Sequence, residues 1–229
     1  SLQGTAAVRV LDQVWTADGA MCLVTELLEG EPLDEVLERV EAGGHRADVA
    51  FVVRLFDAVV DTLRSSHDMG IVHRDLKPEN VFVLSARRGG GVRLLDFGFA
   101  KFTRLRALTA TGMVAGSPSY IAPETWLGRS DVIDHRVDVY GLGAVIFRCL
   151  AGGPPFTGGG DLARLLREAT SAPRPSLHAL CPSLPSEIDD WVLQTLAVDP
   201  AERFQGVGAM WHAFCHVLDI GAVRAAPPR

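Results

Sequence analysis

One short segment, together with a residue beyond it, carries side chains that could do chemistry together. Asp75, Lys77 and Asn80 lie within six residues of each other, and Asp96 follows further along the chain. A carboxylate can accept a proton from a hydroxyl group, a lysine supplies positive charge, and carboxylate and amide oxygens are ligands that Mg²⁺ prefers. Taken singly, Asp75 is typical of a turn and Asn80 of a cap. Their joint spacing instead favours acid–base chemistry beside a hard metal ion.

Short strands are predicted on both sides of this segment and would position it. Apolar runs at Ile71-Val72, Val81–Leu84 and Val92–Leu95 predict three strands, and a loop with Gly89-Gly90-Gly91 joins the last two. The segment would then form the loop before the second of these strands. Asp96 would follow directly after the third predicted strand.

The rest of the pattern predicts a β hairpin that leads into a mainly helical body. Val8, Val10 and Val14 alternate with other residues before a turn at Asp18-Gly19 and a second strand at Met21–Thr25. Helical periods follow over about 33–40, from the cap at 48 to the glycine at 70, and over 139–150, 162–166, 188–196 and 207–214. The end of the chain, 222–229, is rich in Ala and Pro and is typical of a fraying tail or the start of a linker.

Length and composition narrow the class of protein. The chain has 229 residues, 48% of them apolar and 22% charged, which predicts one large or two small soluble domains with a proper core. Its net charge of −6 disfavours nucleic acid as the main partner. The four cysteines are widely spaced, with no C-x-x-C pair, and predict buried free thiols in a reducing compartment. No uninterrupted apolar run approaches the length of a membrane span.

Five motifs, in the right order and at the right separations, resemble those of protein kinases. His73-Arg74-Asp75-Leu76-Lys77-Pro78-Glu79-Asn80 resembles the catalytic loop, and Asp96-Phe97-Gly98 resembles the metal-binding motif. The others are Ala122-Pro123-Glu124 at the end of an activation segment, Asp138-Val139-Tyr140-Gly141-Leu142-Gly143 at the start of a central helix, and a late arginine motif, Asp199-Pro200-Ala201-Glu202-Arg203. The resemblance runs from the hairpin to about residue 218. The lysine at 77 and the arginine-rich composition resemble bacterial members of the serine/threonine branch.

The resemblance implies roles in phosphoryl transfer from ATP. Asp75 would orient a substrate hydroxyl and accept its proton, and Lys77 would bring a cation to the transferring phosphate. Asn80 and Asp96 would supply oxygen ligands for Mg²⁺, which bridges the phosphates. Gly98 would let the chain turn sharply after the metal ligand.

The resemblance also implies where the adenine of ATP would lie. Thr25 would be the gatekeeper, and the backbones of Glu26 and Leu28 would form the hinge bonds. Phe82 would lie under the base. Leu28 and Phe82 are also typical of ordinary core residues, so this assignment has a structural alternative.

Other members of the motifs are expected to be structural. Glu124 and Arg203 would form a buried salt bridge, and Asp138 would anchor the backbone of the catalytic loop. His73 and Phe97 would pack together, and neither would be catalytic.

The segment between Asp96 and Glu124 is expected to be regulatory. Thr109 and Thr111 fall where bacterial kinases of this type resemble one another in carrying autophosphorylation sites, and the Arg74 guanidinium could take a phosphothreonine. Ser117 would bond Asp75 and Lys77 in the part that receives the substrate. The alternative is that these threonines are solvated loop residues of no consequence.

Three parts of a complete kinase are not found in this sequence. No G-x-G-x-x-G precedes residue 20, no helix with the expected glutamate is recognised, and both lysines, Lys77 and Lys101, follow Asp75, so neither can be the strand lysine. The chain would be a fragment of a longer kinase, a catalytically inactive binding or regulatory module, or a divergent enzyme. We expect little kinase activity from the 229 residues alone.

The expected fold class is α+β, a protein-kinase-like fold with a truncated small lobe and a complete, mainly helical large lobe. Residues 1–30 would be the small-lobe remnant and hinge, 31–218 the large lobe, and 219–229 a tail or linker start. The expected function is transfer of the ATP γ-phosphate, with Mg²⁺, to Ser or Thr hydroxyls of a protein substrate. We expect no nucleic-acid partner, no membrane segment within this chain, and a cytoplasmic location, alone or as part of a longer membrane-anchored protein.

Overall fold

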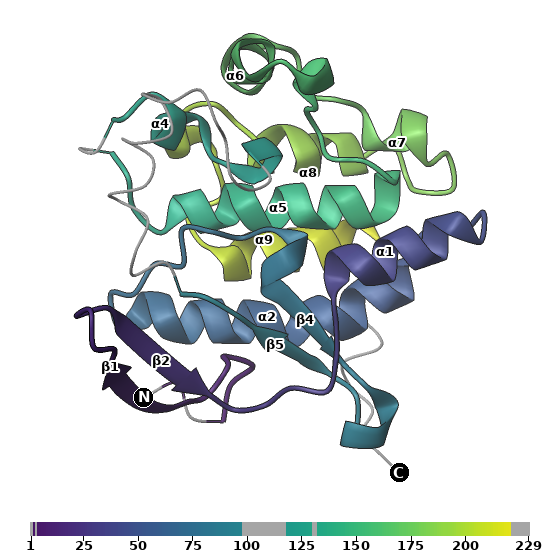
Figure 1. Ribbon diagram of the computed structural model, residues 1–229. Coiled ribbons are helices and arrows are strands. Elements are labelled where there is room, and N and C mark those ends of the chain that lie inside the picture. The colour runs from purple at the N-terminus through teal and green to yellow at the C-terminus, as the bar shows by residue number, and fades with distance from the viewer. Residues whose placement is uncertain (1, 3, 98–117, 130–131, 221–229) are drawn as a thin grey trace.

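The structure has two small sheets and a larger helical body (Figure 1). The computed structural model describes residues 2, 4–97, 118–129 and 132–220. A hairpin comes first in the chain, a three-stranded sheet follows with its helices, and the rest of the described chain is helical. This order confirms the α+β class predicted from the sequence.

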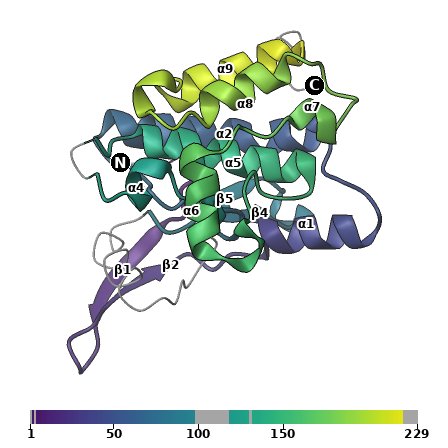
Figure 2. The same ribbon diagram turned by 90° about the horizontal axis from the view of Figure 1, so that it is seen from above.

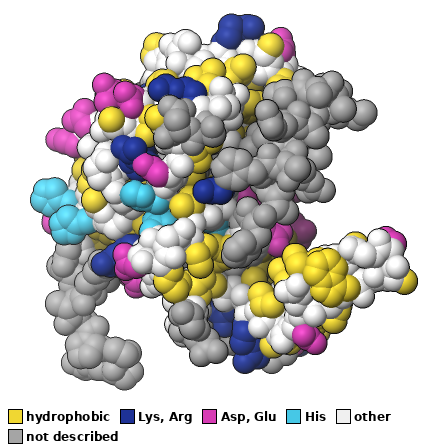
Figure 3. Space-filling model, turned by 90° about the vertical axis from the view of Figure 1, so that its left-hand side faces the viewer, with side chains coloured by type: hydrophobic (Ala, Val, Ile, Leu, Met, Phe, Trp, Pro, Cys, Tyr) yellow, Lys and Arg dark blue, Asp and Glu magenta, His cyan; other side chains and the backbone are white. Residues whose placement is uncertain are grey.

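The predicted hairpin projects from the body (Figure 2). It pairs β1 (Val10–Trp15) with β2 (Met21–Thr25) in antiparallel register, and Gly19 in its turn has a φ of 81°. Every residue of both strands is exposed, and hydrophobic side chains gather over the hairpin at the lower right of Figure 3. Seven large apolar side chains are 42% to 67% exposed there: Val10, Leu11, Val14, Trp15, Met21, Leu23 and Val24. Such a patch is typical of a surface that contacts other protein.

We expect the 229-residue chain to associate with itself through this hairpin and to bind a hydrophobic dye. Replacing two of the exposed side chains, Trp15→Gln with Leu23→Gln, should lower both the average mass in sedimentation and the dye fluorescence. Leu193→Gln is the matched control, because Leu193 is also 51% exposed but lies on α8 (Ile188–Thr195). A monodisperse wild-type chain that binds no dye would contradict this prediction.

A second sheet carries the strands that flank the predicted site. β3 (Gly30–Pro32), β4 (Val81–Leu84) and β5 (Val92–Leu94) pair antiparallel in that order. Gly30 has a φ of 152°, and a Cβ there would lie 2.0 Å from the Val83 carbonyl oxygen, so the pairing requires glycine. The sequence did not predict β3, because it has three residues and includes a proline.

Two predicted helices support this sheet. α1 (Leu33–Ala42) directly follows β3, and α2 (Val49–Asp68) begins where the Asp48 carboxylate accepts the Phe51 N–H at 2.6 Å. Gly70 follows α2 with a φ of 73°, the left-handed conformation that ends many helices. Local sequence signals therefore fix both ends of α2.

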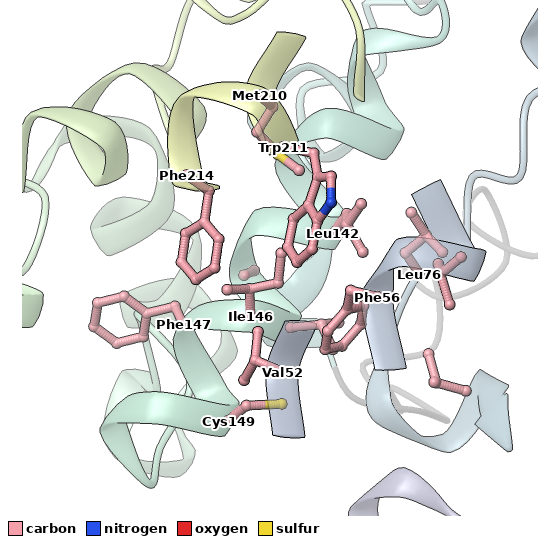
Figure 4. Packing of buried hydrophobic residues seen from close by; sticks show 14 of the residues in the cluster. Val52, Phe56, Leu76, Leu142, Ile146, Phe147, Cys149, Met210, Trp211 and Phe214 are labelled. Atoms are coloured by element: carbon pink, nitrogen blue, oxygen red, sulfur yellow. The ribbon is translucent and has the colours of Figure 1, made fainter. Parts of the chain in front are cut away.

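The core forms where α2 packs against the C-terminal helices (Figure 4). Almost every residue of α5 (Arg136–Ala151) is buried, and Gly143 allows α8 close to it, since a Cβ there would lie 2.0 Å from Thr195 Cγ2. The other helices of this part are α4 (Pro123–Trp126), α6 (Leu162–Ser171), α7 (Leu177–Leu180) and α9 (Val207–Val217). Among the residues described, no helix is both long and apolar enough to cross a bilayer.

The strand predicted at Ile71-Val72 is wrong, because this segment is irregular. The Ile71 N–H donates to the Ser66 carbonyl at 2.8 Å and so helps to end α2. The segment forms no ladder with any described residue. It serves instead as the connection from α2 into the loop that carries Asp75.

None of the four cysteines forms a disulfide with another described cysteine, as predicted, but they are not all buried. Cys149 lies in the core, whereas Cys181 and Cys215 are partly buried. Cys22 is exposed on β2, so the prediction of burial is wrong for it. The reason is that both faces of the hairpin are open in this structure.

Candidate active site

Asn80 holds Asp75 in place. Asn80 ends a short 3-10 turn, Pro78–Asn80, and its Nδ2 donates to the Asp75 carbonyl oxygen and to Asp75 Oδ2, both at 2.8 Å. Lys77 Nζ lies 3.8 Å from the same Oδ2, and the Asp75 and Lys77 side chains are 15% and 16% exposed. The structure therefore brings three of the four residues together as a fixed carboxylate beside a cation, both within reach of solvent.

Asp96 follows β5 on the neighbouring segment. It is exposed and has a φ of 48°, and the Leu95 N–H before it donates to the Asn80 carbonyl at 2.9 Å. Because Asn80 uses Nδ2 for Asp75, its Oδ1 is left as an acceptor without a donor among the described residues. A carboxylate and an amide oxygen are ligand types that suit Mg²⁺.

Asp138, in the first turn of α5, anchors the backbone of the loop. Its carboxylate is 1% exposed and accepts the N–H of His73 at 2.8 Å and that of Arg74 at 2.7 Å. Arg74 has a φ of 65°, which is uncommon for a residue with a side chain. These two bonds help to hold that strained conformation next to Asp75, so the predicted anchoring role of Asp138 is confirmed.

The Asp138 carboxylate has a third hydrogen-bond partner, which sequence reasoning did not find. His67 Nε2, in the last turn of α2, lies 2.7 Å from Asp138 Oδ2. The His67 ring also lies against His135, with ring centroids 5.3 Å apart. The available signal was a histidine in the last helical turn before the loop, but no spacing rule names Asp138 as its partner.

His73 packs against Phe97 as predicted, with ring centroids 4.8 Å apart. The buried ring donates from Nε2 to the Leu95 carbonyl at 2.8 Å and accepts the Asp75 N–H at Nδ1 over 3.3 Å. This pair of bonds fits the neutral tautomer with its proton on Nε2. Burial lowers the pKa of His73 below the ordinary value of 6.5.

The lowered pKa of His73 predicts that acid weakens the fold. Below about pH 6.5 the His73 side chain binds a proton more readily in the unfolded chain than in the folded chain. The free energy of unfolding should therefore fall as the pH falls. Nitrogen NMR should show that the His73 ring titrates at a lower pH in the native chain than in urea. A native ring that titrates at the same pH as the unfolded ring, or at a higher one, would contradict the assignment.

The residues expected around an adenine lie on two segments. Thr25 is the last residue of β2 and is exposed, and Glu26 and Leu28 follow it, both partly buried. Phe82 is partly buried in β4, opposite Arg93 of β5. Sequence reasoning did not find a contact between the first segment and β5, the strand next to Phe82: the Glu26 carboxylate accepts a hydrogen bond from Arg93 Nε at 3.2 Å.

Comparison with known protein families finds a family that matches most of the chain. The family described as the protein kinase domain matches residues 2–215. The chain belongs to the protein kinase family. The predicted family is thereby confirmed.

Two relatives of this kinase chain are bacterial serine/threonine-protein kinases. Serine/threonine-protein kinase pkn2 of Myxococcus xanthus is 36% identical over 210 residues, which are 90% of this chain and 24% of that protein. Serine/threonine-protein kinase PknA of Mycobacterium tuberculosis is 35% identical over 209 residues, 90% of this chain and 44% of that protein. The chain thus spans less than half the length of either relative.

A solved kinase domain confirms the fold. The crystal structure of the PknI kinase domain of Mycobacterium tuberculosis superposes with a TM-score of 0.69 at 25% identity. The superposition covers 92% of this chain and 71% of that one. The likeness therefore extends over nearly the whole chain.

The late arginine of this kinase chain forms the predicted buried salt bridge. Arg203 Nη1 and Nη2 each donate to one carboxylate oxygen of Glu124 at 2.7 Å, and the two side chains are 0% and 1% exposed. The same guanidinium donates to the carbonyls of Ala197, Arg136 and Val198. The pair fixes the end of the activation segment to the helical body.

Several residues predicted from the kinase resemblance lie outside the described residues. They are Gly98, Thr109, Thr111 and Ser117. Arg74, the predicted partner of a phosphothreonine, is described and exposed. Their roles stay predictions.

Proposed function

We propose that the protein containing this chain transfers the γ-phosphate of ATP to Ser or Thr hydroxyls of a protein substrate, with Mg²⁺. One observation carries the proposal: the Asp75 carboxylate is held by Asn80, has Lys77 Nζ 3.8 Å away, and neighbours the segment that bears Asp96. Membership of the kinase family and the serine/threonine kinases among its relatives support the reaction class.

In this proposal each residue of the site would have its own task in the reaction. A bound Mg²⁺ would supply positive charge that offsets the negative charge of the ATP phosphates. Asn80 Oδ1 and the Asp96 carboxylate would hold the ion. The Asp75 carboxylate, held by the Asn80 amide, would orient the substrate hydroxyl and accept its proton. Lys77 Nζ would supply positive charge to the phosphate in transfer.

The nucleotide would extend from this loop to the segment after β2. The backbones of Glu26 and Leu28 would bond the adenine, with Thr25 beside it and Phe82 below it. Leu28 and Phe82 are both partly buried, which supports a place at the edge of a base rather than in the deep core.

The test is transfer of labelled phosphate by the full-length protein. Incubation with Mg²⁺ and γ-labelled ATP should label serine or threonine in the protein itself or in casein. The label should be lost on chelation of Mg²⁺ with EDTA. A full-length protein that binds ATP but never transfers phosphate would overturn the proposal.

A second candidate is a binding or regulatory module without activity. This candidate concerns residues 1–229 by themselves: no lysine among them precedes Lys77, so this stretch alone offers no lysine for the α- and β-phosphates. For the same reason we expect little transfer from residues 1–229 alone. Labelling by this short chain that vanished with Asp75→Asn would instead favour a divergent enzyme.

Phosphorylation of the activation segment is proposed as the means of regulation. After incubation of the full-length protein with Mg²⁺ and ATP, mass spectrometry should find phosphate on Thr109 or Thr111. Arg74→Ala should then reduce the gain in activity that this phosphate brings, because the exposed guanidinium could form paired bonds to it. Ser117 should stay unmodified. Full activity after replacement of both threonines by alanine would contradict the proposal.

A further inference from the structure

The carboxylate of Glu26 joins three segments that are distant in the sequence. Its Oε1 accepts the backbone N–H of Arg9 at 3.0 Å and Arg93 Nε at 3.2 Å. The Glu26 N–H in turn donates to the Arg9 carbonyl at 2.9 Å. The Arg9 hydrogen bond, aided by the Arg93 guanidinium, lowers the pKa of Glu26, so the carboxylate is charged at neutral pH.

Arg93 belongs to a strand that the rest of the fold holds firmly. The Val8 N–H donates to the Leu94 carbonyl at 3.0 Å, and the Leu94 N–H donates to the Ala6 carbonyl at 2.7 Å. The Ala6 N–H is bound by Thr62 Oγ1 of α2 at 2.8 Å. β5 is therefore tied through residues 6–8 to the long helix of the body.

The same strand leads directly into the metal-binding end of the site. Asp96 lies two residues beyond the end of β5, and the Leu95 N–H between them bonds the Asn80 carbonyl at 2.9 Å. On the other side of the pair, Glu26 belongs to the segment proposed to bond the adenine. The exposed fractions are 31% for Arg93 and 23% for Glu26, so the pair is partly shielded from solvent.

We infer that Glu26 is a positioning residue whose side chain, through Arg93, sets the adenine-binding segment at the correct distance from Asp96 and Asn80. The inference rests on the proposed function. A ligand that reaches both ends, such as ATP with Mg²⁺, would depend on this alignment. A ligand that reaches only the adenine end would not.

The binding of two ligands distinguishes a role of Glu26 in aligning the two ends of the site from an effect on the adenine-binding segment alone. Adenosine probes the adenine end alone, and the non-hydrolysable ATP analogue AMP-PNP with Mg²⁺ probes both ends at once. The affinity of each is measured by calorimetry for the full-length wild-type protein and for Glu26→Gln, Arg93→Gln and Arg93→Lys. Arg164→Gln is the matched control, because it breaks a different ion pair, between an exposed arginine and the partly buried Glu168 at 2.8 Å on α6.

Both glutamine variants should bind Mg²⁺ and AMP-PNP about three- to fivefold more weakly, the effect expected of one partly exposed ion pair, and should bind adenosine within twofold of wild type. Arg93→Lys should restore most of the loss. In steady state the KM for ATP should rise while kcat at saturating ATP changes little. Arg164→Gln should change none of these values.

Other results would overturn the inference. If the affinities for both ligands fell equally, Glu26 would affect only the local shape of the adenine-binding segment. If neither affinity changed, Glu26 would have no positioning role. A wild-type protein that binds neither ligand would refute the proposed function, and this inference with it. Because adenosine binding also reports whether each variant is folded, a misfolded variant is recognised by loss of both ligands together with a lowered melting temperature.

Discussion

Asp75→Asn should lower kcat for phosphate transfer by about 100- to 10,000-fold, the range that one proton-accepting group contributes. The new amide cannot take up the proton of a substrate hydroxyl. It keeps an oxygen that can accept from Asn80 Nδ2, so the hydrogen bond now made at 2.8 Å has a replacement acceptor. The KM for ATP and the melting temperature should therefore stay close to those of wild type. Initial rates at saturating ATP, together with a thermal melt, measure both.

The matched control is Asp61→Asn, the same chemical change at a carboxylate on α2 that is 68% exposed and 3.7 Å from Arg64. It should leave both turnover and melting unchanged. Turnover of Asp75→Asn within tenfold of wild type would refute the proton-accepting role. A large fall in melting temperature would instead assign Asp75 to the structure of the loop.

Sequence signals predicted the elements of the fold best where those signals were local. α2 was predicted because Asp48 and Gly70 mark its ends and an apolar face runs between them. The strand predicted at Ile71-Val72 failed because two β-branched residues also suit an irregular connection, whose donor goes to Ser66. A run this short does not reveal whether a partner strand is present.

Sequence reasoning predicted which residues of the candidate site lie together better than it predicted the contacts that hold them. The order and spacing of the motifs singled out Asp75, Lys77 and Asn80, and the structure brings them together. The contacts that hold the site join residues far apart in the chain. Glu26 binds Arg93, and His67 binds Asp138. Such pairs follow no local period, so they become visible only when the fold places their segments side by side.

Arg203→Ala should lower the free energy of unfolding by about 3–5 kcal/mol, because it leaves the Glu124 carboxylate buried and unpaired. For a chain of 229 residues this corresponds to a fall in melting temperature of roughly 6–20 °C. Urea unfolding followed by tryptophan fluorescence measures the change. Arg164→Ala, which removes an exposed pair on α6, is the control and should cost less than about 1 kcal/mol.

A double variant separates the buried charge from the other contacts of Arg203. Glu124→Leu with Arg203→Met removes both charges and keeps similar volume, so it should be more stable than Arg203→Ala. Recovery should be incomplete, since the carbonyls of Ala197, Arg136 and Val198 still lose their donor. If the double variant were no more stable than Arg203→Ala, the three lost hydrogen bonds to carbonyls would account for the lower free energy of unfolding, and the unpaired Glu124 charge would not.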